Sequence, residues 1–300
     1  MNLFLTAASA AFALAACAPA PSPPADQASA TPFTSDRISI VTRGTGPDVI
    51  LVPGLNSHRD VWDGVADSLE GRYRLHLVQV HGFAGLPPGA NADGPVSAPV
   101  AEEIARYITE TGLSKPAVVG HSMGGTITMM LAARHPDAVG RIMVVDMTPF
   151  LGVMFSPPGS TAEAVRRMAD SIRTAMLAAP PGAPTMFEQM VATMTRVDSM
   201  KPALVSASRA SDPATAANAF HELIVTDLRP ELPRITAPMA VLYVVPPTSP
   251  LPPAQYEAAM RTAYAAAPTS QLIKIEDSFH FIQFDQPGRL IAELDALMRR

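Results

Sequence analysis

A serine flanked by glycines carries the strongest chemical signal in the sequence. Ser122 lies at the centre of Gly-His-Ser-Met-Gly (120–124), between an apolar run and a segment typical of a helix. This pattern in this context is typical of a nucleophile elbow, a strand-to-helix turn so tight that glycines must flank the serine. We therefore predict that Ser122 is a nucleophile rather than a structural serine in a turn, and that His121 supports packing.

A serine hydroxyl attacks a carbonyl at neutral pH only with help from other groups. It needs a base, a group that orients the base, and hydrogen-bond donors for the oxyanion that forms. The elements that could bring such groups together follow from the pattern of apolar residues.

Apolar segments typical of strands alternate with amphipathic segments typical of helices from Ile38 onward. The apolar runs are continuous, which is typical of strands buried on both faces of a parallel sheet. The sequence thus predicts an α/β fold, with a mostly parallel sheet and helices on both faces. The predicted strands are 38–44, 48–54, 73–82, 116–120, 141–146, 239–245 and 271–277, and the first two predicted helices are 58–70 and 99–112.

Residues 151–233 interrupt this alternation. They contain no convincing strand and seven of the 16 methionines of the chain. Met186, Met190 and Met194 recur every four residues, which predicts a stripe on one helix face. The stripe could pack against the core or line an apolar substrate pocket, and one stripe can do both. We predict a helical cap at 151–233, inserted into a core formed by 37–150 and 234–300.

The motif and the order of the elements resemble the α/β-hydrolase fold family, in particular its small esterase-like members with a helical cap. The resemblance covers residues 37–300 and includes a loop near residue 54, the elbow at Ser122, the inserted cap and a late histidine. It implies that His280, between the last predicted strand and the last predicted helix, is the base. His280 would take the Ser122 proton and return it to the leaving group.

The resemblance also implies two backbone donors for the oxyanion. One is the N–H of Met123, at the start of the helix after the elbow. The other comes from a loop that precedes the first long helix, which favours Leu55, with Asn56 as a nearby polar contact for the substrate. The stretch HGFAG (81–85) is nearer to the family's usual His-Gly spelling, but it follows the next strand and is expected to be a structural turn.

The acid that would orient the base is not at its usual place. The family usually has Asp or Glu directly after the strand predicted at 239–245, where this chain has no carboxylate before Glu257. Asp146, Glu276 and Asp277 are candidates. We predict Asp146, because it follows a strand and catalytic groups gather at the carboxyl ends of such strands. The alternatives are Asp277, which is awkwardly close to the base in sequence, and a Ser-His pair without an acid.

The first 16 residues form an uncharged apolar run that ends at Cys17, the only cysteine. The run is too short to span a bilayer but fits a signal peptide (1–16), and with Cys17 it resembles a bacterial lipobox, whose cysteine is lipidated. A plain secretory signal and a buried helix are the alternatives. Residues 17–36 are rich in proline and alanine, which is typical of a tether. We expect export and a lipid anchor in the bacterial cell envelope, at the outer membrane because residue 18 is Ala rather than Asp.

Composition narrows the classes of function. The net charge is −5 and no basic run occurs, which argues against nucleic-acid binding. No residue set resembles a metal site or a phosphate-binding loop, so we expect no cofactor and no metal. We predict a serine hydrolase that cleaves carboxylic esters of small to medium apolar acyl groups through an acyl-enzyme on Ser122. The alternatives are a non-catalytic surface lipoprotein of this fold, and an enzyme for perhydrolysis, lactone opening or C–C bond hydrolysis.

Overall fold

The computed structural model describes residues 33–156, 160–180 and 182–300. The predicted signal peptide, Cys17 and most of the predicted tether therefore lie outside the described residues. No helix within the described ranges is long and apolar enough to cross a membrane.

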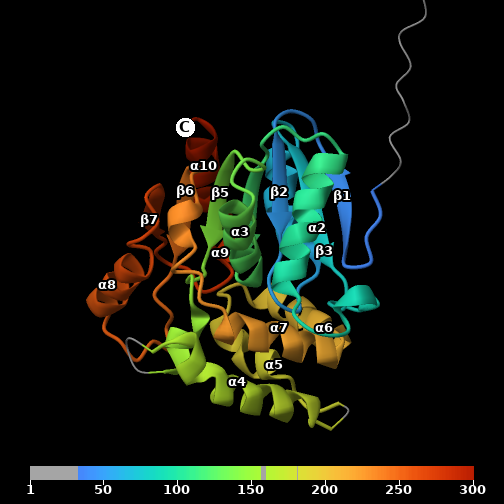
Figure 1. The fold of residues 1–300 in the computed structure, drawn as a ribbon, viewed down its shortest axis with the longest axis vertical. Helices are drawn as coiled ribbons and strands as arrows, with labels where there is room; N and C mark the ends of the chain where they lie inside the picture. The colour runs from blue at the N-terminus through green and yellow to red at the C-terminus, as the bar shows by residue number, and fades with distance from the viewer. Residues whose placement is uncertain (1–32, 157–159, 181) are drawn as a thin grey trace, which may run out of the picture. The chain divides into compact units, whose positions relative to one another are not determined.

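A seven-stranded sheet forms the centre of the fold (Figure 1), in the order β1-β3-β2-β4-β5-β6-β7. β1 is antiparallel to β3, and every other neighbouring pair is parallel. The predicted fold class is thus confirmed. The strands are β1 (Ile38–Arg43), β2 (Asp48–Val52), β3 (Arg74–Val80), β4 (Ala117–His121), β5 (Arg141–Val145), β6 (Met239–Tyr243) and β7 (Ser270–Lys274).

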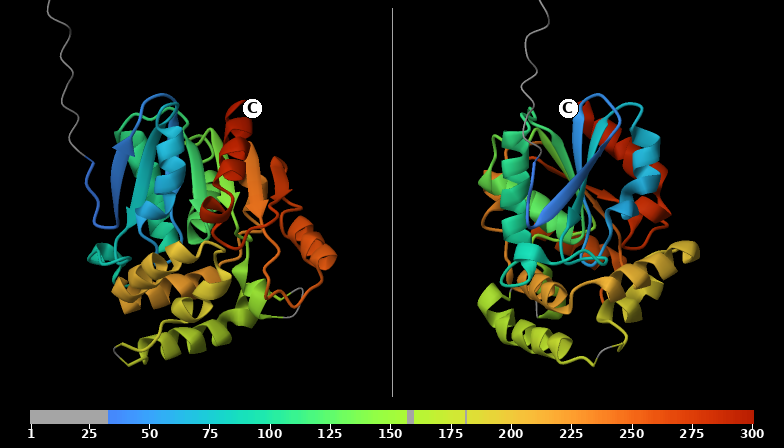
Figure 2. Two further views of the ribbon diagram at one scale, coloured as in Figure 1. Left: turned by 180° about the vertical axis from the view of Figure 1, so that it is seen from behind. Right: turned by 90° about the vertical axis from the view of Figure 1, so that its right-hand side faces the viewer.

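Successive residues of the central strands point to opposite faces of the sheet, where two separate cores form. In β2, Ile50 and Val52 join one core, and Val49 and Leu51 join the other. The first core is covered by α2 and α3 and the second by α1 and α10, as the edge-on view in Figure 2 shows. This double burial explains the uninterrupted apolar runs. The helices are α1 (Asp63–Leu69), α2 (Ser97–Glu110), α3 (Met123–Arg134), α8 (Pro253–Ala263), α9 (Ile282–Asp285) and α10 (Pro287–Met298).

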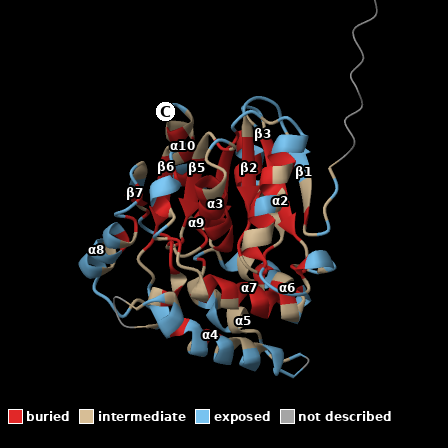
Figure 3. Cartoon of the chain, viewed as in Figure 1, coloured by how far each residue is buried: buried red, intermediate tan, exposed pale blue. Residues whose placement is uncertain are grey.

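The segment between β5 and β6 forms a layer of helices at the carboxyl ends of the strands (Figures 1 and 2). The inner helix, α7, is largely buried, whereas α4 has a mostly exposed outer face (Figure 3). The helices of this layer are α4 (Ala162–Leu177), α5 (Met186–Met190), α6 (Lys201–Ala210) and α7 (Pro213–Val225).

The three methionines predicted to share a helix face do not lie on one helix. α5 ends at Met190, and a 3₁₀ turn separates it from Met194. The backbone then turns toward the core, since the Met194 carbonyl accepts a hydrogen bond from the Phe281 N–H at 2.9 Å. The Thr195 hydroxyl also donates to the Asp285 carboxylate. The predicted stripe was wrong, because α5 ends at Met190 and Met194 lies beyond the 3₁₀ turn.

A buried carboxylate joins the helical layer to the core. Glu222 of α7 accepts hydrogen bonds from the backbone N–H groups of Val96, Ser97 and Ala98, at 2.7, 2.6 and 2.9 Å. These groups begin α2, whose first N–H groups have no acceptor within the helix and carry a partial positive charge. One side chain of the insertion therefore completes a helix of the core.

We expect Glu222→Ala to lower the free energy of unfolding by about 2–4 kcal/mol, because it leaves several buried N–H groups without an acceptor. Urea unfolding followed by circular dichroism would measure the change. Glu163→Ala, which removes an exposed glutamate paired with Arg166, is the matched control, with an expected change below about 0.5 kcal/mol. Equal stabilities of the two variants would contradict a capping role for Glu222.

Candidate active site

Ser122 occupies the turn between β4 and α3 and has backbone angles of φ 53° and ψ −120°. A positive φ strains any residue with a side chain, so the surrounding packing must hold this turn. The Ser122 N–H donates to the Val145 carbonyl at 2.9 Å. A Cβ on Gly120 would lie 2.0 Å from the Gly124 carbonyl oxygen, and one on Gly124 would lie 2.3 Å from that of Val52. Both glycines of the motif are therefore required, and the predicted strand-turn-helix context is present.

The structure brings Asp146 and His280 together. Asp146 directly follows β5, and its Oδ2 lies 2.6 Å from Nδ1 of His280. Its Oδ1 accepts the N–H of Val244 at 3.0 Å. Both oxygens of the carboxylate thus have a partner, and the side chain is only 12% exposed. A proton on His280 Nδ1, donated to this carboxylate, leaves Nε2 as the basic nitrogen.

The other carboxylates considered from the sequence lie elsewhere. Asp277 is exposed, and its backbone carbonyl accepts from the Gln286 amide. Glu276 forms an ion pair with Lys274. Among the described residues, Asp146 is the one carboxylate that contacts the His280 ring.

His121 packs beneath His280, as expected for a residue that supports packing. Its ring is buried, lies 4.6 Å from the His280 ring between centroids, and donates from Nε2 to the His280 backbone carbonyl at 3.0 Å. Burial, with a smaller contribution from the nearby His280, holds the pKa of His121 well below its ordinary value. His121 is therefore neutral and fixes the backbone that carries His280.

The depressed pKa of His121 gives folding a pH dependence. The unfolded chain takes up a proton on this residue near pH 6.5, while the folded protein does not. The free energy of unfolding should therefore fall as the pH drops below about 6.5, by up to about 1.4 kcal/mol per pH unit from this group. His121→Phe cannot titrate and should show a shallower decline in urea unfolding over this acidic range. His76, whose pKa burial also lowers, remains in both proteins. Identical slopes would contradict the assignment.

The loop after β2 lies against the elbow. A Cβ on Gly54 would lie 3.1 Å from the Ser122 Cβ, and Leu55 and Asn56 line the same cavity as Ser122. Within the described part of the chain, the N–H groups of Leu55 and Met123 have no hydrogen-bond acceptor. Both are thus available as donors, as the predicted oxyanion site requires.

The competing stretch at 81–85 does not line this cavity. Gly82 and Gly85 have φ values of 91° and 87°, which glycine adopts without strain. The Gly82 carbonyl accepts the Asp212 N–H at 2.7 Å, and the Ala84 N–H donates to the Ser211 hydroxyl. These hydrogen bonds hold the turn that follows β3 against the start of α7, so the stretch has a structural role.

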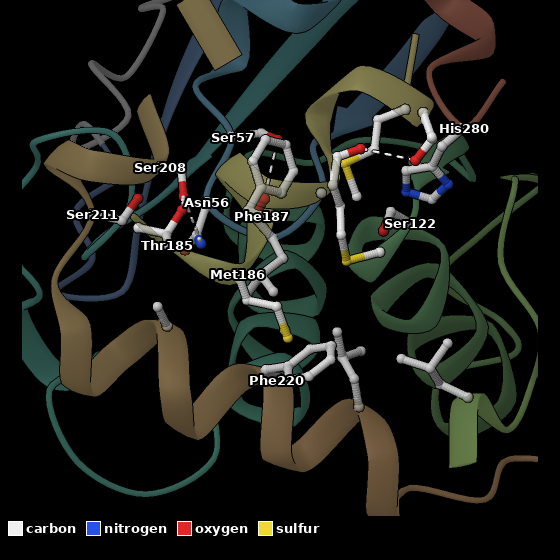
Figure 4. A pocket seen from close by; sticks show the side chains of 18 of the residues that line it. Asn56, Ser57, Ser122, Thr185, Met186, Phe187, Ser208, Ser211, Phe220 and His280 are labelled. Atoms are coloured by element: carbon white, nitrogen blue, oxygen red, sulfur yellow. Dashed lines mark hydrogen bonds between the residues drawn. The ribbon is translucent and has the colours of Figure 1, made fainter. Parts of the chain in front are cut away.

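A cavity of about 710 Å³ lies between the helical layer and the carboxyl ends of the strands. Figure 4 shows Ser122 and His280 on one side of it and Met186, Phe187 and Phe220 projecting from the helical layer. The residues at 186, 190 and 194 all line it, so methionines of the insertion do face this space. The space is mostly apolar, which suits an apolar chain.

Some polar residues of the cavity could not be recognised in the sequence. Thr185 and Ser208 line it beside Asn56, but neither lies in a motif. Their approach depends on how α5 and α6 pack, which apolar periodicity does not report. No cluster of three or more metal-ligating side chains occurs in the part of the chain that the structure describes.

The chain is similar in sequence to two curated proteins and in structure to one solved protein, as follows. The pimeloyl-(acyl-carrier protein) methyl ester esterase of Nitrosomonas europaea is 33% identical over 112 residues, 37% of this chain and 42% of that protein. The match thus spans about two fifths of that relative's length. The enzyme of the same name from Vibrio vulnificus strain YJ016 is 26% identical over 210 residues, 67% of this chain and 76% of that protein. An esterase structure from Thermogutta terrifontis superposes with a TM-score of 0.68 and 22% identity, covering 87% of this chain and 93% of that one.

A comparison with models of protein families identifies the family that has this sheet, elbow and helical insertion. A sequence model of the alpha/beta hydrolase fold matches residues 47–287, most of the described chain. The protein belongs to the α/β-hydrolase fold family.

Proposed function

We propose that this protein is a serine hydrolase that cleaves carboxylic esters of small to medium apolar acyl groups. The observation that carries the proposal is the 2.6 Å contact between Asp146 and His280, at the cavity that Ser122 also lines. Two relatives are named as methyl ester esterases, which also supports ester hydrolysis. A non-catalytic binding protein would have no use for a buried, fully partnered carboxylate that fixes the tautomer of a histidine beside a strained serine.

The proposed reaction assigns one role to each group. Ser122 Oγ attacks the ester carbonyl while Nε2 of His280 takes its proton. Asp146 holds the proton on Nδ1 and stabilises the imidazolium. The N–H groups of Leu55 and Met123 stabilise the oxyanion. His280 then protonates the departing alcohol, and the acyl group remains on Ser122 until a water molecule, activated by the same histidine, releases the acid.

The cavity supports the proposed preference for apolar acyl groups. Among the described residues that line the cavity, Arg209 is the one basic residue other than histidine. Its guanidinium pairs with the carboxylate of Glu188. No uncompensated positive charge is thus available there for an anionic substrate, and the aromatic and thioether side chains offer apolar contact.

A substrate panel tests the proposal. The purified protein should hydrolyse p-nitrophenyl esters of short to medium chains, and a fluorophosphonate probe should label Ser122, as read by mass spectrometry. A folded protein that neither turns over any ester nor reacts with the probe would favour the binding protein. Turnover of lactones or peracid formation in preference to ester hydrolysis would favour the other chemistries of the fold.

We also propose that the mature protein begins at a lipidated Cys17 and is held in the bacterial cell envelope. The apolar run before this single cysteine supports the proposal. The lipid anchor would then be the one contact with the membrane. Mass spectrometry of the N-terminal peptide should find the acyl groups, and Cys17→Ser should release the protein from the membrane fraction. An unmodified Cys17 in membrane-bound protein would refute it.

A further inference from the structure

A polar cluster interrupts the apolar wall of the cavity. It consists of Asn56 from the loop after β2, Thr185 at the start of α5 and Ser208 of α6. The Thr185 and Ser208 hydroxyl oxygens lie 2.9 Å apart, and the Asn56 amide nitrogen lies 3.5 Å from the Ser208 oxygen. Figure 4 shows the cluster on the opposite side of the view from His280, with Ser122 nearer to His280.

The cluster has one hydroxyl hydrogen more than its own contacts use. Thr185 Oγ1 accepts the Glu188 N–H, and Ser208 Oγ accepts from the Asn56 amide. The contact between the two hydroxyls uses one of their two hydrogens. Within the described chain the other hydrogen has no acceptor, although Ser208 is only 3% exposed.

The cluster also has an acceptor without a partner. The amide oxygen of Asn56 is shielded from solvent and forms no hydrogen bond within the described residues, although the residue lines the cavity. A buried polar atom in this condition is costly unless a bound group satisfies it. The Asn56 amide also has a second N–H hydrogen that no described residue accepts. Free donors beside a free acceptor are complementary to a hydroxyl group, which both donates and accepts. A hydroxyl also fits either orientation of the Asn56 amide.

The neighbouring serine provides a contrast. Ser211 lines the same cavity, but its hydroxyl donates to the Ala207 carbonyl at 2.8 Å and accepts the Ala84 N–H at 3.0 Å. It therefore has no hydrogen left for a ligand. A carboxylate is disfavoured at the cluster, because nearby Arg209 is already paired with Glu188.

We propose that the cluster of Asn56, Thr185 and Ser208 binds a hydroxyl group on the acyl chain of the substrate, so that the enzyme prefers hydroxyacyl esters. The inference rests on the proposed ester hydrolysis. The acyl chain is assigned to this side because His280 protonates the leaving oxygen, which places the alcohol portion at His280 and directs the acyl chain away from it.

The experiment compares methyl esters of increasing chain length, each with and without a terminal hydroxyl. At the length that reaches the cluster, kcat/KM should be about tenfold higher for the hydroxylated ester, the value of a net hydrogen-bond gain of about 1.4 kcal/mol. Ser208→Ala and Thr185→Val should each reduce this ratio toward one, and Thr185→Ser should keep it. Ser211→Ala is the matched control and should leave the ratio unchanged.

The outcomes separate the two proposals. If unsubstituted esters are hydrolysed but the hydroxyl gives no advantage at any length, the inference is wrong and the proposed function stands. If the advantage persists in both Ser208→Ala and Thr185→Val, the hydroxyl binds elsewhere and the inference is also wrong. If no ester of either series is hydrolysed, the proposed function fails and the inference fails with it. Circular dichroism of each variant shows that a lost ratio does not reflect unfolding.

Discussion

Ser122→Ala is expected to lower kcat for ester hydrolysis by about 10⁶-fold while the protein keeps its fold. The substitution removes the attacking oxygen, so no acyl-enzyme can form and the oxyanion donors act alone. Alanine adopts the positive φ of this position no worse than serine, and the Ser122 side chain makes no hydrogen bond among the described residues. Initial rates with a p-nitrophenyl ester and the melting temperature together would measure both effects.

Ser171→Ala provides a control for this substitution. Ser171 lies on α4, where its hydroxyl donates only to the Arg167 carbonyl of the preceding turn. Turnover should be unchanged in this variant. Normal turnover in Ser122→Ala, or labelling of a different serine by a fluorophosphonate, would show that the elbow is structural.

Asp146→Asn is expected to lower kcat by about 10⁴-fold. The asparagine oxygen can keep the hydrogen bond from the Val244 N–H, so its NH₂ group then faces His280. That group donates to Nδ1 and places the ring proton on Nε2, where His280 can no longer take the Ser122 proton. The melting temperature should change little, because asparagine tolerates the φ of 51° at this position.

Asp277→Asn is the matched control. Asp277 undergoes the same chemical change at a similar backbone angle, φ 53°, but it is exposed and does not contact His280. Its turnover should stay near that of the unmodified protein. Near-normal turnover in Asp146→Asn would disprove the orienting role, and a large loss in Asp277→Asn would transfer that role to Asp277.

The architecture could be predicted because its signals are local. Each strand of the sheet lies within a short apolar run, and the elbow lies within five residues whose glycines have a steric reason. The ends of the elements are less regular. β7 stops at Lys274, before the predicted end at residue 277, where Asp277 has a positive φ of 53° that is not a strand conformation.

The sequence reduces the partners of His280 to a few carboxylates, but it does not place Asp146 beside the ring. These two residues are 134 positions apart, and only the pairing of β5 with β6 brings Asp146 next to Val244 and the loop that carries His280. In the polar cluster, Asn56 could be predicted as a polar contact, but its partners Thr185 and Ser208 could not be foreseen. The geometry of the cluster depends on where α5 ends and how α6 packs, and these are set by tertiary contacts rather than by periodicity.

The hydrogen bonds between Glu222 and the start of α2 limit how the helical insertion can be exchanged between members of the family. Residues 151–233 look like a module that a protein engineer could exchange for the insertion of a relative. Removing them would also remove the acceptor for three core N–H groups and uncover the apolar surface beneath α7. A functional chimera of this protein must therefore transplant a matching acid together with the helix start that it serves.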